Sequence, residues 1–312
     1  MTVKMIIDTD PGVDDAMAIL YAAAAPDIHL LGLTTIFGNV RTPMATRNAL
    51  RLVEMMGLDV PVAEGAPQPQ ALPPFEPADW VHGAEGFGNV PAEEPNRQAA
   101  SENAAEFLVR MAREHKGELV VCPIGPLTNL AAAAALDPEF TSNCARIVTM
   151  GGAARVKGNV TAFAEANTWH DPHAARDLWL AGGHQIMVGL DVTLQILCDR
   201  KDFAAIATDS PALGGFLQSA ADFYIDFYQR EAGLEGCGLH DPAAVIACTH
   251  PDLFTMESSP LKVVTEGDEI GRTVMEPDGT GPDVHVCVDV NGDAVKDLWL
   301  STVKALDERL LT

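Results

Sequence analysis

Four aspartates lie close together near the start of the chain, at the end of a short apolar run. Asp8, Asp10, Asp14 and Asp15 all fall within "DTDPGVDD". Asp14 and Asp15 are compatible with an ordinary helix start, where the positive end of the helix dipole favours carboxylates. Asp8 and Asp10 instead end a strand that should be buried, where an unpaired acid is costly. A hard divalent cation, which prefers oxygen ligands, accounts for the whole group better.

Three later segments carry polar side chains that suit a metal ion or a polyhydroxyl ligand. In "GLHDPAAVIA", His240 and Asp241 precede a proline, and in "PIGPLTNL" Thr128 follows a strand end. The third segment, "GNVTAFAEANTWHDP", contributes Asn159, Glu165 and Asn167. Each segment also has an ordinary explanation: a helix N-cap for Asp241, a turn for Thr128 and loop residues for the last group.

Short apolar runs alternate with helical patterns, and this alternation must position those side chains. We expect strands at 3–8, 28–38, 117–125, 145–152 and 185–192, and helices at 13–25, 42–57, 126–136 and 171–183. The pattern predicts an α/β fold of the Rossmann-like kind, with a mostly parallel central sheet and helices on both faces. Ligands of such sheets gather at the carboxyl ends of the strands, where the polar residues above fall.

The chain is expected to form one domain over residues 1–312. Residues 65–100 are rich in proline and glycine and should form a long loop, either a solvated insertion or a lid at the rim of a site. Residues 211–238 read as a helix with several aromatic side chains, followed by a glycine-rich turn. The tail should add three more strands and a last amphipathic helix.

Composition narrows the class of function. The chain has 312 residues and a formal net charge of −24, which argues against a nucleic-acid or anionic-membrane partner. The N-terminus lacks the features of a signal peptide, and no apolar run is long enough to span a bilayer. The six cysteines are scattered without zinc-like spacing, as in proteins of a reducing compartment. We therefore expect a cytoplasmic protein that handles neutral small molecules or cations.

The opening block "DTDPGVDDAMAI" resembles the signature of the nucleoside hydrolases, the inosine-uridine preferring N-ribohydrolase family. The resemblance continues in order through later blocks: "IFGNV", "HG" at 82–83, "IGPLTNL", "MGGA", "GNVT", "AEANTWHDP" and "LHDP". It implies calcium-dependent hydrolysis of the N-glycosidic bond of ribonucleosides, giving ribose and a free base. It also implies a homodimer or homotetramer that serves purine or pyrimidine salvage.

The resemblance further implies a role for each matching residue. Calcium would be held by the carboxylates of Asp10, Asp15 and Asp241 and by the main-chain oxygen of Thr128. The catalytic residues would be Asp10, which takes a proton from water, His240, the acid for the leaving base, and Asn167. The substrate would be bound by Asp14, Asn39, His82, Met150, Asn159, Glu165, Asn167 and Tyr228, the last on a mobile flap at 211–238.

The sequence departs from the family pattern next to Glu165. Ala166 stands where the family carries an aromatic residue, so base preference should differ from the plain inosine and uridine pair. Trp169 is a candidate for stacking on the base, with a core role as the alternative. Two other functions remain open: a phosphatase of the haloacid dehalogenase type, which also begins with Asp-x-Asp after a strand, and a nucleoside or metal binder without catalysis.

Overall fold

The apolar run after the N-terminus forms β1 (Val3–Thr9), the strand that carries the first aspartates. The structure is a computed structural model that describes residues 2–74 and 76–311. β1 pairs in parallel with β2 (Ile28–Thr35) on one side and β4 (Leu119–Pro123) on the other. The aspartate cluster therefore starts from the middle of a sheet, where a strand is held on both sides.

Nine strands form this sheet, in the order β10-β9-β11-β6-β5-β4-β1-β2-β3. The run from β11 to β3 is parallel, and β9 and β10 add antiparallel pairs at one edge. The remaining strands are β3 (Val62–Glu64), β5 (Arg146–Met150), β6 (Gln185–Val188), β9 (Phe254–Val263), β10 (Thr273–Met275) and β11 (Asp283–Val290). A separate two-stranded ribbon joins β7 (Leu197–Asp199) to β8 (Gly236–Gly238).

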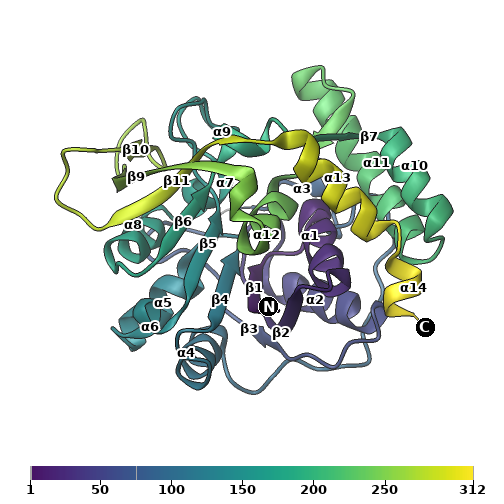
Figure 1. Ribbon diagram of the computed structural model, residues 1–312, viewed down its shortest axis with the longest axis horizontal. Helices are drawn as coiled ribbons and strands as arrows, with labels where there is room; N and C mark the ends of the chain where they lie inside the picture. The colour runs from purple at the N-terminus through teal and green to yellow at the C-terminus, as the bar shows by residue number, and fades with distance from the viewer. Residues whose placement is uncertain (1, 75, 312) are drawn as a thin grey trace.

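Helices cover both faces of the sheet, as the alternation of strands and helices predicts (Figure 1). Met5 and Ile7 of β1 pack into one hydrophobic cluster, with side chains of α1, α11, α12 and α13, while Ile6 packs into another with α4, α5 and α8. This alternation follows from the two-residue period of a strand. The helices are α1 (Val13–Ala24), α2 (Thr42–Met55), α3 (Asp79–His82), α4 (Ala104–Glu114), α5 (Thr128–Leu136), α6 (Phe140–Asn143), α7 (Ala166–His170), α8 (Pro172–Leu180), α9 (Leu190–Thr193), α10 (Arg200–Asp209), α11 (Leu213–Ala232), α12 (His240–Thr249), α13 (Gly292–Val303), α14 (Leu306–Leu310) and the 3₁₀ turn η1 (Pro251–Leu253).

Two segments differ in detail from the expectation. The described residues between 65 and 100 are mostly irregular, but they include the one-turn helix α3. Residues 211–238 hold the 20-residue helix α11 and then β8, where only a turn was expected. β7 and β8 have three residues each, too few for a periodic signal in the sequence. Among the described residues, no helix is long and apolar enough to cross a membrane.

Candidate active site

A cavity of about 350 Å³ lies at the carboxyl ends of the parallel strands. Met150 is the last residue of β5, Ile124 follows β4, and Asn39 lies in the turn after β2. All three side chains or their backbones line the cavity. The edge of the sheet predicted from the sequence is therefore the edge that holds the cavity.

Most residues selected from the sequence line this cavity. They are Asp14, Asn39, His82, Met150, Asn159, Glu165, Asn167, Tyr228, His240 and Asp241. Four others are not among its lining residues: Asp10, Asp15, Thr128 and Trp169. Asp10 and Asp15 lie next to the cavity, because both accept hydrogen bonds from the lining residue Asn39.

Three buried carboxylates meet at the floor. Asp14 and Asp15 come from the first turn of α1, and Asp241 comes from the first turn of α12. One carboxylate oxygen of each lies within 4.8 Å of the others. The Asp15 carboxylate is held by the Thr9 hydroxyl at 2.5 Å, by the Gly12 amide at 2.9 Å and by the Asn39 side chain at 2.9 Å. The first turns of two helices that are far apart in sequence thus place three negatively charged side chains next to one another.

Asp10 completes the acidic group from the end of β1. Its Oδ2 accepts a hydrogen bond from the Asn39 amide at 2.6 Å. A Cβ atom on Gly38 would lie 1.9 Å from Asp10 Oδ2, and one on Gly125 would lie 2.5 Å from Oδ1. Both distances are impossible for real atoms, so the glycines of "IFGN" and "PIGP" are required for the Asp10 carboxylate to fit where it does.

The acidic group fits a divalent cation. Burial and repulsion from Asp15 raise the pKa values of Asp10 and of Asp14, the latter to about 8, and burial raises that of Asp241. Among the described residues, Asp10 Oδ1 and Asp14 Oδ1 are buried without a hydrogen-bond partner. Unpaired buried oxygens are costly, and carboxylate oxygens are the ligands that hard cations prefer. The grouping also includes Asp14, to which the family resemblance gives a role in sugar binding.

Thr128, expected to offer its main-chain oxygen to the metal, is not among the residues that line the cavity. It is the first residue of α5. Its main-chain oxygen therefore points along the helix, where the amide four residues later can donate a hydrogen bond to it. Its hydroxyl donates to Asp171 Oδ2 at 2.8 Å. The residue of this block that lines the cavity is Ile124, whose main-chain oxygen accepts from Asn167 Nδ2 at 2.9 Å.

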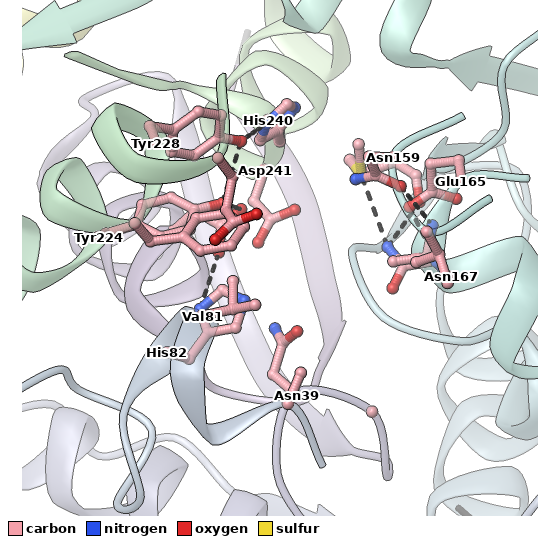
Figure 2. Close-up of a pocket in the computed structure, with 18 of the residues that line it drawn as sticks. Asn39, Val81, His82, Asn159, Glu165, Asn167, Tyr224, Tyr228, His240 and Asp241 are labelled. Carbon is pink, nitrogen blue, oxygen red and sulfur yellow. Dashed lines mark hydrogen bonds and ion pairs between the residues drawn. The ribbon is translucent and has the colours of Figure 1, made fainter. Parts of the chain in front are cut away.

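A polar wall rises from α7 and the segment before it. Asn167 Nδ2 also donates to the main-chain oxygen of Met150 at 3.2 Å, which fixes the side-chain amide at the floor. Glu165 is the N-cap of α7 and accepts from the amides of Gly152, Asn167 and Thr168. Asn159 Oδ1 accepts from the Ala166 amide at 3.0 Å. These three side chains leave polar atoms facing the cavity on one side (Figure 2).

An aromatic wall faces them across the cavity (Figure 2). Tyr224 and Tyr228, one turn apart on α11, lie with their hydroxyl oxygens 3.5 Å from each other. The Tyr224 hydroxyl donates to Asp14 Oδ2 at 3.3 Å, and the Tyr228 oxygen lies 2.5 Å from His240 Nε2. His240 Nδ1 lies 2.7 Å from the Thr193 hydroxyl. A continuous chain of hydrogen bonds therefore connects His240 to the carboxylate floor.

Both histidines of this wall are neutral. Burial lowers the pKa of His240 to about 4, and burial with repulsion from His240 and His170 lowers that of His82 to about 3. His82 Nδ1 accepts from the Val13 amide at 3.2 Å, which leaves the proton on Nε2. The His240 imidazole is enclosed, and both of its nitrogens are hydrogen-bonded to hydroxyl groups, of Thr193 and of Tyr228.

Trp169 is not among the lining residues, and several lining residues were missed, among them His170 and Tyr224. The Trp169 backbone packs against Gly271, where an added Cβ would lie 2.9 Å from the Trp169 Cα. His170, the next residue, lines the cavity instead. Tyr224 was also missed, although its spacing of four residues from Tyr228 on a helix was a usable signal.

Comparison with known proteins gives a consistent assignment. The family model of the inosine-uridine preferring nucleoside hydrolases matches residues 5–297. Uridine nucleosidase 1 of Arabidopsis thaliana is 42% identical over 274 residues, which cover 88% of this chain and 82% of the relative. Probable uridine nucleosidase 2 of the same plant is 40% identical over 320 residues, covering 99% and 97%.

Solved structures agree with the sequence matches. A plant nucleoside hydrolase, the PpNRh1 enzyme, superposes with a TM-score of 0.95 at 37% identity and covers 98% of this chain and 100% of its own. A purine-preferring ribonucleoside hydrolase from Gardnerella vaginalis gives 0.93 at 36% identity, with 97% and 98% covered. The chain belongs to the inosine-uridine preferring nucleoside hydrolase family and is an enzyme that hydrolyses the N-glycosidic bond of ribonucleosides.

Proposed function

We propose that the chain hydrolyses ribonucleosides with the help of a calcium ion held by its acidic floor. The observation that carries the proposal is the convergence of Asp14, Asp15 and Asp241 within 4.8 Å of one another, beside Asp10. These donors are all oxygen atoms, as calcium prefers, and Ile124 offers a main-chain oxygen at the same rim. When bound, the cation would supply Lewis acidity to oxygen atoms of water and of the sugar.

Asp10 is the proposed general base. Its Oδ2 is fixed by the Asn39 amide, while Oδ1 has no partner among the described residues and is available to accept a proton. A carboxylate held in one orientation needs no rearrangement when it takes a proton from water attacking C1′ of the ribose. Positioned acid–base groups of this kind contribute roughly 10²–10⁴-fold to a rate.

The ribose would lie between the two walls, on the carboxylate floor. Asp14, Asn39 and Asn167 border the floor and offer one carboxylate and two amide groups for the 2′- and 3′-hydroxyls. Met150 provides an apolar contact for the sugar ring, and Asn159 and Glu165 border the place of the 5′-hydroxyl. This arrangement favours a transition state in which the ribosyl group gains positive charge, because carboxylates surround it.

Protonation of the leaving base would come from the aromatic wall. His240 and Tyr228 share a hydrogen bond of 2.5 Å, and the Tyr228 and Tyr224 hydroxyls lie 3.5 Å apart at the edge of the cavity. A tyrosine hydroxyl can donate its proton to the base, and the phenolate that is left is stabilised by a hydrogen bond from Nε2–H of the neutral His240. His240 would therefore act through the tyrosines rather than by direct contact with the base.

Uridine is the proposed first substrate to examine, since the plant relatives at about 40% identity carry the name uridine nucleosidase. Ala166 lines the cavity and leaves room for larger bases as well. The test is ribose release from uridine, cytidine, inosine and adenosine by the purified chain. Release from at least one of them supports the proposal, and binding of nucleosides without ribose release would point to a non-catalytic binder.

The proposed setting is a reducing compartment such as the cytoplasm, because all six cysteines are buried free thiols. Within it, the enzyme would act in purine or pyrimidine salvage. Organisation as one domain stays a prediction from the sequence, and assembly into a homodimer or homotetramer stays a prediction from the family resemblance. Sedimentation of the purified chain would determine the assembly directly.

A further inference from the structure

Only one side of the short helix α7 (Ala166–His170) lines the cavity. Ala166, Asn167 and His170 line the cavity, and Thr168 and Trp169 do not. This division follows from helix geometry, because residues three and four positions apart share a face. His170 is therefore placed one turn from Asn167, on the same side of the helix as the amide proposed to bind the ribose.

The surroundings of His170 place it beside the segment that leads to α3. The next residue, Asp171, is fully buried, and its Oδ2 accepts from the Gln70 amide at 2.9 Å as well as from Thr128. The long segment is thereby attached beside α7 before it continues to α3 (Asp79–His82). Ala78, Val81 and His82 of that continuation line the cavity together with His170.

The charge environment agrees with this placement. Repulsion from His170 and from His240 contributes to the lowered pKa of His82, so all three imidazoles share one region of the cavity. Burial lowers the pKa of His170 itself to about 3, and the ring is therefore neutral. A neutral imidazole carries one donor and one acceptor nitrogen, which matches the edges of heterocyclic bases.

We propose that His170 contacts the base of the bound nucleoside and is a determinant of base preference. The inference rests on the proposed hydrolysis of ribonucleosides at this cavity. It assigns to the polar wall a role in recognition of the base, in addition to its contacts with the sugar. Tyr228 would face the base from the aromatic wall, so the two walls would contact different edges of it.

The test compares His170→Leu and His170→Gln with wild type and with a control, His173→Leu. His173 lies on α8 and is not among the lining residues. Substrates are uridine, cytidine, inosine, 5′-deoxyuridine and p-nitrophenyl riboside, whose leaving group has no base edge. We expect His170→Leu to lower kcat/KM for uridine about tenfold, the loss of one hydrogen bond, and to change p-nitrophenyl riboside by less than about twofold.

His170→Gln should restore part of the activity, because an amide also offers a donor and an acceptor, and the ranking of the three natural nucleosides should change in both variants. An equal loss on uridine and p-nitrophenyl riboside would overturn the inference. So would a His170→Leu effect that disappears with 5′-deoxyuridine, since the contact would then be to the sugar. If the wild type releases ribose from none of the substrates, the proposed function itself fails.

Discussion

The Nε2 atom of His240 lies 2.5 Å from the hydroxyl oxygen of Tyr228, although the two residues come from different helices and are twelve positions apart. Because of this hydrogen bond, His240 does not act as an isolated acid. Its imidazole is neutral and hydrogen-bonded at both nitrogens, and its access to the substrate passes through the hydroxyl groups of α11.

Replacing Tyr228 by phenylalanine should interrupt this chain of hydrogen bonds without changing the shape of the wall. We expect kcat on inosine to fall by about 10²-fold, the size of a lost acid catalyst, while p-nitrophenyl riboside is cleaved almost as before. The reason is that p-nitrophenolate leaves without a proton. Steady-state kinetics on both substrates measures this, with Tyr21→Phe in the core of α1 as the control. Equal losses on the two substrates would contradict the relay.

Gly125 should tolerate no side chain. A Cβ there would lie 2.5 Å from Asp10 Oδ1, so Gly125→Ala must displace the proposed general base. We expect a loss of activity of about 10²-fold or more with a small change in melting temperature. Gly215→Ala is the matched control, because nothing lies within 4 Å of that position, and an alanine within α11 should stabilise the fold by about 0.5–1 kcal/mol. Full activity of Gly125→Ala would show that Asp10 is not needed in its observed position.

His170 should make stability depend on pH in a defined direction. Burial lowers its pKa from 6.5 to about 3 in the folded state. Between these values the unfolded chain binds more protons than the folded chain, so this residue destabilises the fold as the pH falls. The melting temperature of His170→Gln should therefore decrease less than that of wild type between about pH 7 and about pH 4.5, measured in chelator. Parallel curves for the two proteins would contradict a buried neutral imidazole.

The sequence was sufficient to predict the edge of the sheet at which the site lies. The strand ending at Thr9 and the strand ending at Met150 were both identified from apolar runs, and parallel strands bring their carboxyl ends to one edge. Asp10, directly after β1, was therefore expected at the correct edge, and Asn39, in the turn after β2 (Ile28–Thr35), lies at the same edge. The short β7 and the single turn α3 could not be predicted, because neither is long enough to show a period.

Prediction was weaker where a side chain's direction within a turn decides its role. Thr128 and Ile124 lie in the same block, but only the structure shows that the helix begins at Thr128 and that Ile124 borders the cavity. In α7, one position separates Trp169, which does not line the cavity, from His170, which does. The pKa of His240 also depends on burial by residues distant in sequence, which composition and spacing do not reveal.

The measurement that tests the central claim most directly is ribose release from uridine by chelator-treated protein before and after addition of calcium. We predict no release without the metal, recovery on addition of calcium, and no recovery in Asp241→Asn, which removes one carboxylate of the floor. Unchanged release by the chelator-treated wild type, or full calcium-independent activity of Asp241→Asn, would contradict a catalytic cation at this site.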